Sequence, residues 1–295
     1  MKTCLMNQEW AVDPACVERH SDFSLLASHL GFTEGVFLSK FPSNWLSLAF
    51  QRAEVLCEPQ KTKVREVLRR IKESASLLPS GRGYDGQRNW GVNACDQHEV
   101  LPFDRLMSTS STQHFTDISA IDEFDWSSAR EARTAGSLKT IIEILQPLIR
   151  LSYNIILVDA YFAPQRKGNR DLFKSVVDMA FSNKCREFKF FVRTVNWPYI
   201  ENQCEGELRK LLGRYSHGSK KISVVCFDDS GCEHKQHARY IFSELGGLRL
   251  DKGLQIDESL VDFSTIGRVT HDELLKFFVQ RPLAMKVDYR ADFCF

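Results

Sequence analysis

The chain lacks an excess of charge of either sign. Its 295 residues include 39 Lys and Arg and 38 Asp and Glu, which gives a formal net charge of +1. The molecule as a whole therefore does not attract nucleic acid or an anionic membrane, and any polyanion site has to be a local patch. A hydrophobic fraction of 43% suffices for the core of one large domain or two ordinary domains.

Long hydrophobic runs and paired cysteines are also missing. No stretch approaches the roughly 18 apolar residues of a membrane span, and residues 1–10 have no apolar core of the kind that a signal peptide needs. The nine cysteines are scattered singly, without a Cys-x-x-Cys pair. This pattern argues against a disulfide framework and favours a reducing compartment, so we expect a cytoplasmic protein with no transmembrane segment.

Cofactor and metal motifs are weak. The glycine-rich stretch 79–91 fits neither the dinucleotide fingerprint nor the P-loop, so we expect no cofactor. Its residues Arg82, Arg88 and Trp90 can clamp a nucleotide or can belong to a flexible loop. Cys232 and His234 lie close to His237 in the sequence, but zinc takes four ligands and no second cluster is apparent. We therefore expect no metal.

Residues 1–131 carry few decisive signals. A basic amphipathic helix is predicted over residues 61–74, where apolar residues recur every three or four positions, whereas the short apolar runs before it fit either helix or strand. The stretch 96–131 is acidic and polar, which predicts a linker or a domain boundary. We therefore expect an N-terminal region of unknown fold with an acidic linker, followed by a domain over residues 132–295. Four tryptophans of the first region suit a surface for protein assembly: Trp10, Trp45, Trp90 and Trp126.

The second half alternates between helix and strand patterns. Ser137 is a plausible N-cap for an amphipathic helix over 138–150, and residues 154–159 form an apolar run typical of a central strand. The alternation predicts an α/β domain with a mixed sheet flanked by helices. The remaining predicted elements are helices over 171–181 and 205–212 and strands over 188–192, 222–227 and 237–242.

The stretch 237–254 is the candidate functional segment. It reads as a hairpin turning at Gly246-Gly247, in which His237 and Arg239 share one face and offer a nucleophile or acid beside a phosphate-binding cation. The alternative is an ordinary strand histidine bonded to a neighbour. Further candidates for holding phosphate lie on the hairpin or at the ends of the predicted parallel strands, where ligands gather: Arg249, Lys252, Arg193, Asp159 and Tyr161.

The order of these motifs resembles one half of the phospholipase D superfamily. The resemblance covers roughly residues 137–289 and is strongest to the phospholipase D-like domain at the C-terminus of microtubule-interacting-and-trafficking-domain proteins. The motifs that carry it are a strand ending Asp159-Ala160-Tyr161-Phe162, a strand ending Arg193-Thr194, and His237-x-Arg239 followed by four residues and Glu244.

The resemblance implies a metal-independent phosphodiesterase, most plausibly a nuclease, with catalytic positions at His237, Arg239 and Glu244. Since the chain holds one such motif, it also implies a homodimer in which a second His237 protonates the leaving group. Arginine replaces the lysine of the superfamily motif, and its downstream Gly-Ser-x-Asn is missing. The alternative is a non-catalytic module that binds a nucleic-acid backbone, a lipid headgroup or a protein partner.

Overall fold

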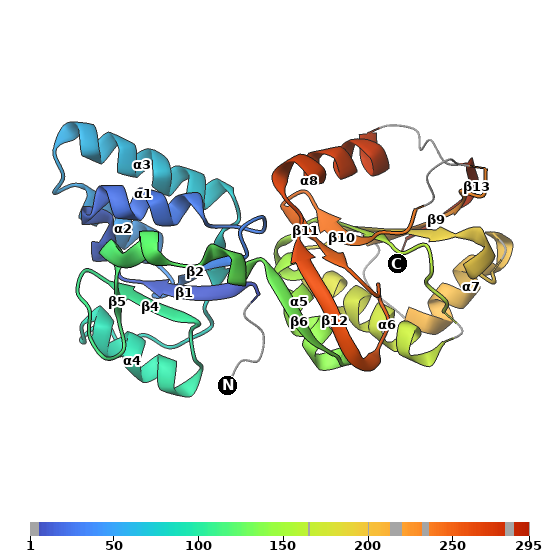
Figure 1. Cartoon of the computed structure of the whole chain (residues 1–295), viewed down its shortest axis with the longest axis horizontal. Helices are drawn as coiled ribbons and strands as arrows, with labels where there is room; N and C mark the ends of the chain where they lie inside the picture. The colour runs from blue at the N-terminus through green and yellow to red at the C-terminus, as the bar shows by residue number, and fades with distance from the viewer. Residues whose placement is uncertain are drawn as a thin grey trace. The chain divides into compact units, whose positions relative to one another are not determined.

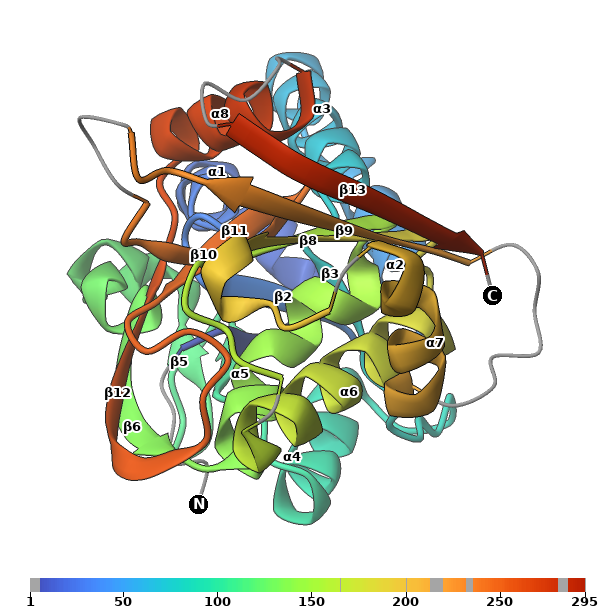
Figure 2. The same cartoon turned by 90° about the vertical axis from the view of Figure 1, so that its right-hand side faces the viewer.

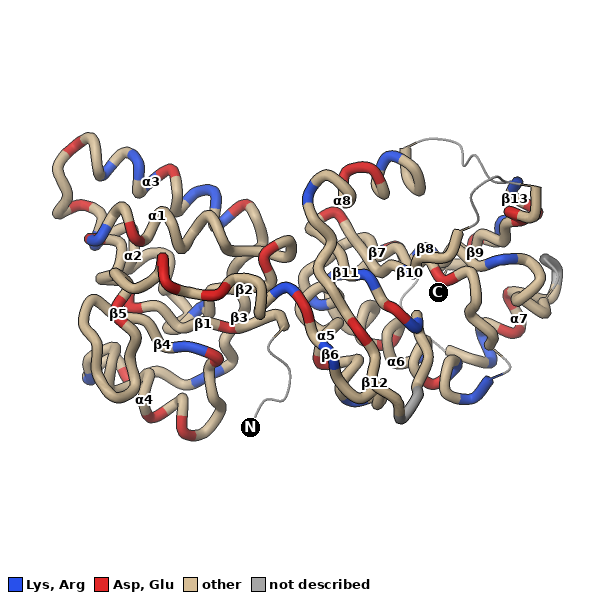
Figure 3. The backbone as a smooth tube through the Cα atoms, in the orientation of Figure 1, with Lys and Arg blue, Asp and Glu red and all other residues tan. Residues whose placement is uncertain are grey.

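The computed structural model describes residues 6–164, 166–199, 201–212, 220–231, 236–280 and 286–294. The chain divides into two compact units, which we call the N-terminal unit (residues 5–130) and the C-terminal unit (residues 131–295). Both are α/β (Figure 1). In the described part of the chain, no helix is long and apolar enough to cross a membrane. Basic and acidic residues are interspersed along the elements of both units (Figure 3).

The N-terminal unit is built on a five-stranded sheet in the order β3-β2-β1-β4-β5, with every neighbouring pair parallel. The strand order reverses between β1 and β4, as in doubly wound sheets. The strands are β1 (Gln8–Val12), β2 (Val36–Lys40), β3 (Leu77–Pro79), β4 (Arg105–Ser108) and β5 (Thr116–Asp117), and the α-helices are α1 (His20–Ser28), α2 (Trp45–Ala53), α3 (Glu58–Glu73) and α4 (Trp90–Val100).

The structure corrects two expectations for this region. The acidic stretch 96–130 is not a linker, because it supplies β4 and β5 and buries Leu106, Met107 and Ile118 in the core. The tryptophans do not form a surface: Trp10 and Trp45 are fully buried and Trp90 is 8% exposed. Trp126 packs against that core and stacks on Trp10 at a ring distance of 5.5 Å. A small number of apolar residues in the stretch suffices to contribute to the core, because each of its strands is short.

The C-terminal unit has an eight-stranded mixed sheet in the order β13-β9-β8-β7-β10-β11-β12-β6, which confirms the predicted mixed sheet flanked by helices (Figure 2). Its centre, β7, β8 and β9, is parallel, and β10 joins β7 antiparallel. The strands are β6 (Glu131–Gly136), β7 (Asn154–Val158), β8 (Glu187–Arg193), β9 (Lys221–Asp228), β10 (Arg239–Ser243), β11 (Gly246–Leu250), β12 (Asp257–Thr265) and β13 (Lys286–Cys294).

Helices cover both faces of this sheet. Helices α5 (Leu138–Leu151), α6 (Lys167–Ser182) and α7 (Glu201–Leu212) lie on one side and α8 (Arg268–Leu275) on the other (Figure 1). Helix α5 begins as predicted: the Ser137 hydroxyl accepts the Thr140 amide at 3.2 Å, and the apolar stripe that includes Leu145 is buried. The capping bond and the periodic stripe are local signals, which is why the sequence predicts this helix well.

The hairpin of the candidate segment turns two residues earlier than expected. Ser243 pairs with Gly246, so Glu244 and Leu245 make the turn and the two glycines begin β11. A Cβ atom on Gly247 would lie 2.5 Å from Phe242 Cβ and 2.8 Å from Ile266 Cδ1. Glycine is therefore needed here for close packing between neighbouring segments, and its resemblance to a turn signal misled the sequence reading.

Candidate functional site

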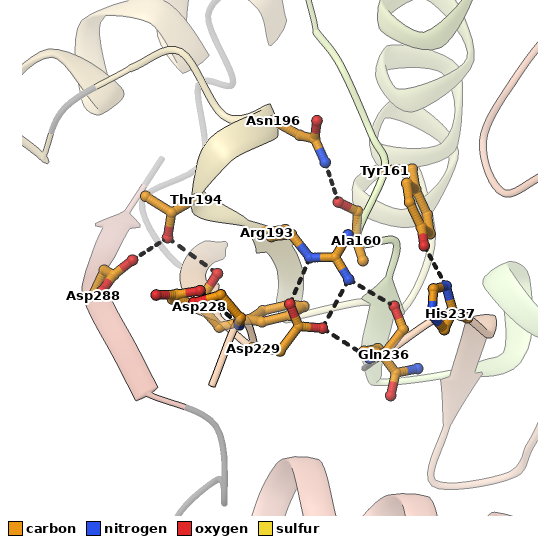
Figure 4. A network of polar contacts seen from close by, with 12 residues as sticks. Ala160, Tyr161, Arg193, Thr194, Asn196, Asp228, Asp229, Gln236, His237 and Asp288 are labelled. Atoms are coloured by element: carbon orange, nitrogen blue, oxygen red, sulfur yellow. Dashed lines mark hydrogen bonds and ion pairs between the residues drawn. The ribbon is translucent and has the colours of Figure 1, made fainter. Parts of the chain in front are cut away.

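The candidate site lies at the edge where the parallel strands of the C-terminal unit end. Asp159 directly follows β7, Arg193 is the last residue of β8, and Asp229 directly follows β9. Strand β10 runs the other way and so begins at this edge, which brings His237 and Arg239 to the same place. We call these residues, with Tyr161, the His237 site; Figure 4 shows part of it.

Asp159 organises one side of the site. Its side chain is almost fully buried, and its two oxygens accept the backbone N–H groups of Tyr161 at 3.0 Å and Leu254 at 3.1 Å. Arg239 Nε lies 3.5 Å from Asp159 Oδ1, and Arg239 Nη1 donates to the Asp251 carbonyl. Burial raises the pKa of Asp159, while the two amides and Arg239 act in the opposite direction.

Gly253 allows the chain to close around this carboxylate. Its φ is +66°, and a Cβ atom at this position would lie 2.2 Å from Asp159 Oδ2 and 2.5 Å from Arg239 Cδ. Any other residue would therefore clash with the buried carboxylate and strain the backbone. The sequence reading missed Gly253, although it is the one glycine of the 251–254 segment.

A bidentate ion pair organises the other side. Arg193 Nε and Nη2 donate to the two oxygens of Asp229 at 2.7 and 2.8 Å. The Gln236 amide donates to the same carboxylate at 2.8 Å, and its carbonyl accepts from Arg193 Nη2 at 3.2 Å. The hydrogen bond from Arg193 lowers the pKa of Asp229. This network fixes the residue directly before His237, so it also places the imidazole.

The His237 ring is exposed and held at one nitrogen. His237 Nδ1 is hydrogen-bonded to the Tyr161 hydroxyl, whereas Nε2 makes no hydrogen bond within the described part of the chain (Figure 4). Two guanidinium groups flank the Tyr161 ring, with Arg239 Cζ at 4.7 Å and Arg193 Cζ at 4.9 Å from its centroid. Tyr161 thereby links the imidazole to both arginines.

This arrangement has a defined chemical capability. When Nδ1 carries the proton and donates to Tyr161, the lone pair of His237 Nε2 faces outward as a nucleophile or base. Arg239 Nε is buried without a hydrogen bond in the described structure, so this guanidinium is incompletely satisfied by Asp159. The Arg239 side chain is 24% exposed, so an anion that approaches His237 would meet a guanidinium group.

Glu244 is not part of this site. It lies in the turn at the far end of β10, where its carboxylate accepts the amides of Tyr153 at 2.7 Å and Asn154 at 3.1 Å. It lies five positions after Arg239, a span of roughly 16 Å at about 3.3 Å per residue. Glu244 is therefore not at the catalytic position that we expected. It instead stabilises the start of β7.

The other predicted phosphate contacts are only partly brought together. Arg249 pairs with Tyr240, the neighbour of Arg239, so its side chain projects from the opposite face of the sheet. It lines a separate cavity of about 460 Å³ instead. Lys252 follows Asp251 beside the site, but its ammonium donates to the Ser259 hydroxyl. Of the predicted set, Asp159, Tyr161, Arg193, His237 and Arg239 meet.

The glycine-rich loop of the N-terminal unit is anchored. The Arg82 side chain is 2% exposed, pairs with Glu9 at 2.8 Å and lies over the Phe103 ring at 3.7 Å. Arg88 pairs with Asp96 at the surface at 2.5 Å. Arg82 therefore has no capacity left to clamp a nucleotide.

Metal ligation finds no support in the described residues, which contain no group of three or more His, Cys, Asp and Glu side chains placed to hold an ion. Cys232 and His234, the other two residues of the weighed metal cluster, lie outside the described residues.

Comparisons with known proteins leave the site to be interpreted from its own geometry. No family model matches the chain, and no curated protein matches it. Among solved structures, the archaeal chromatin protein TrmBL2 aligns over 93% of this chain and 98% of its own length, with 9% identity and a TM-score of 0.30. That TM-score is too low to indicate a shared fold.

Proposed function

We propose that the C-terminal unit recognises a phosphodiester of nucleic acid and cleaves it at His237 without a metal ion. The observation that carries this proposal is the exposed imidazole, held at Nδ1 by Tyr161 and open at Nε2, next to two guanidinium groups. An oriented imidazole with a free nitrogen is a suitable nucleophile for phosphorus, and the arginines complement the phosphate charge.

The proposed reaction has two steps. His237 Nε2 attacks phosphorus as the bond to the leaving oxygen breaks, and His237 of a second copy gives that oxygen its proton. Water then attacks the phosphohistidine, the P–N bond breaks, and the proton of the water returns to the second imidazole. The reaction therefore requires a homodimer with two His237 rings on one phosphorus, in agreement with the expectation from the phospholipase D resemblance.

The unsatisfied Nε of Arg239 supports a second candidate, a non-catalytic phosphate-binding module. In that function the guanidinium shifts from Asp159 to the ligand, and the histidine contributes no bond making. Binding would then depend on salt and on Arg239, and it would survive His237→Asn.

Cleavage of end-labelled single- and double-stranded DNA and RNA tests the first candidate. We expect His237→Ala to lower the rate at least about a hundredfold, EDTA to leave it unchanged, and His114→Ala, a change at an exposed histidine of the N-terminal unit, to have no effect. Equal cleavage by wild type and His237→Ala, or inhibition by EDTA, would overturn the catalytic assignment. Salt-dependent binding without cleavage, lost in Arg239→Ala, would establish the second candidate.

The dimer has its own test. Sedimentation of wild-type protein should show a dimer at working concentration. A monomer that cleaves with unchanged specific activity on dilution would contradict the two-histidine reaction.

A further inference from the structure

A second cavity adjoins the His237 site. It has a volume of about 490 Å³, within the range of about 300–1,000 Å³ typical of small-molecule pockets. We call it the Asp228 cavity, and it is lined by Arg193, Thr194, Val195, Phe227, Asp228, Asp229, Ser230 and Asp288. Arg193 and Asp229 belong to both places. Figure 4 shows Thr194 and Asp288 on one side of Arg193 and Tyr161 with His237 on the other.

The free hydrogen-bonding groups of this cavity are acceptors. The Thr194 hydroxyl is directed at Asp288 and at the Phe227 carbonyl, 3.1 Å away, so its single proton is already used. Asp228 Oδ1 accepts the Ser230 amide at 2.8 Å, while Oδ2 makes no hydrogen bond within the described part of the chain. Asp228 therefore presents an open carboxylate oxygen.

Asp228 and Asp288 are ionised at neutral pH, but only Asp228 has an open oxygen, since Asp288 accepts from Thr194 and pairs with Lys286 at 3.1 Å. The backbone hydrogen bond from Ser230 is the main cause that lowers the pKa of Asp228. The hydrogen bond from Thr194 is the main cause that lowers the pKa of Asp288, followed by the one from Lys286. An ionised carboxylate accepts hydrogen bonds and cannot donate, so the cavity suits a ligand group rich in N–H donors.

Charge separates the two halves of the combined site. The half at Tyr161 carries the guanidinium groups of Arg193 and Arg239. Of the three carboxylates in the Asp228 cavity, Asp229 pairs with Arg193 and Asp288 with Lys286, which leaves the negative charge of Asp228. A phosphate is repelled from the cavity and attracted to the other half. A neutral group attached to that phosphate and bearing amino donors fits both requirements.

We propose that the Asp228 cavity takes the nucleobase next to the phosphodiester held at His237, and that it selects bases with an exocyclic amino group over thymine and uracil. This inference rests on the proposed function. Carboxylates accept from the cytosine amino group in protein–DNA contacts, whereas thymine and uracil offer no amino group. A good contact of this kind gives about 1–3 kcal/mol of discrimination, or about five- to 150-fold in affinity.

Competition between 20-residue homopolymers tests the base selection. Wild-type protein should bind and cleave oligo(dA) and oligo(dC) at least about fivefold better than oligo(dT). Asp228→Asn should reduce that preference to within about twofold, because an amide presents a donor as well as an acceptor. The matched control is Asp262→Asn, a change at a carboxylate that lines the other cavity, and it should keep the full preference.

A substrate change gives the same test without a protein variant. A single abasic position in oligo(dA), placed beside the cleaved bond, should lower cleavage there to the oligo(dT) level. Equal use of the three homopolymers by a His237-dependent activity would overturn the base cavity and leave the proposed function standing. A preference that persists in Asp228→Asn would also overturn it. Absence of binding and cleavage with every homopolymer would overturn the proposed function itself.

Discussion

Two arginine–carboxylate pairs, one in each unit, differ in how completely they are satisfied. In the N-terminal unit, Arg82 is 2% exposed, lies 2.8 Å from Glu9, and all three of its nitrogens make hydrogen bonds. In the C-terminal unit, Arg239 is 24% exposed, lies 3.5 Å from Asp159, and its Nε makes no hydrogen bond. The complete pair is part of the architecture, whereas the incomplete pair leaves one buried guanidinium nitrogen without a hydrogen bond in the described residues.

The topology of the two sheets explains why a site like the His237 site forms in the C-terminal unit and not in the described part of the N-terminal unit. All strands of the N-terminal unit are parallel, so the chain only leaves the sheet at the carboxyl edge. In the C-terminal unit, antiparallel β10 enters the sheet at that edge and brings residues that precede a strand beside residues that follow one. His237 meets Tyr161 by this route.

The largest effect that we expect is on the buried pair. Arg82→Ala leaves the Glu9 carboxylate without its cation and should lower the free energy of unfolding by about 3–5 kcal/mol. Urea unfolding followed by tryptophan fluorescence measures it, because four of the five tryptophans lie in the N-terminal unit. Arg88→Ala, which breaks the exposed pair with Asp96, should cost at most about 1 kcal/mol. If Arg82→Ala and Arg88→Ala lowered the free energy of unfolding equally, burial of the Arg82–Glu9 pair would not matter to stability.

Gly253→Ala should have the next largest effect. A Cβ atom 2.2 Å from Asp159 Oδ2 and a φ of +66° together should cost about 2–4 kcal/mol and displace Arg239. Thermal unfolding monitored by circular dichroism measures the loss. Gly86→Ala is the control, since no atom lies within 4 Å of its Cβ position, and it should change stability by at most about 0.5 kcal/mol. If Gly253→Ala left the stability unchanged, the residues around the Asp159 carboxylate could move to accommodate the methyl group at little cost.

Acid should expose the difference between the two carboxylates of the His237 site. The folded-state pKa of Asp229 lies below its ordinary 3.8, so its contribution to stability is complete above that value and is lost as pH falls through the lower one. The pKa of Asp159 is raised, so its contribution has the opposite sign and is lost as pH rises through the folded-state value. Asp229→Asn should therefore flatten the fall in melting temperature below about pH 4, and Asp262→Asn should not.

The smallest effect concerns the relocated glutamate. Glu244→Ala removes two hydrogen bonds to exposed amides and should cost about 1 kcal/mol, while the proposed cleavage activity should stay within about twofold. Chemical unfolding and cleavage assays on the same preparation measure the two quantities. A tenfold loss of activity at unchanged stability would return Glu244 to the catalytic group.

Local signals in the sequence were sufficient for much of the C-terminal unit. The N-cap and apolar stripe of α5, and the apolar run of β7, lie within one segment each, and the structure has both elements. The sequence did not predict the fold of the N-terminal unit, because the strands of this unit are two to five residues long. Runs this short carry no periodicity, so burial of Leu106 and Trp10 depends on neighbours distant in the sequence.

The sequence by itself determined the α/β class of the C-terminal unit, because helix and strand periods are local properties. The predicted strand started too early: β10 begins at Arg239, so His237 precedes the strand and does not share a strand face with Arg239. Only the tertiary structure decided which other groups join them. Sheet order brought Asp159, Tyr161 and Arg193 to the imidazole and sent Glu244 to the opposite end of β10. The completeness of each ion pair, 3.5 Å at Asp159 against 2.8 Å at Glu9, is set by packing between segments far apart in the chain.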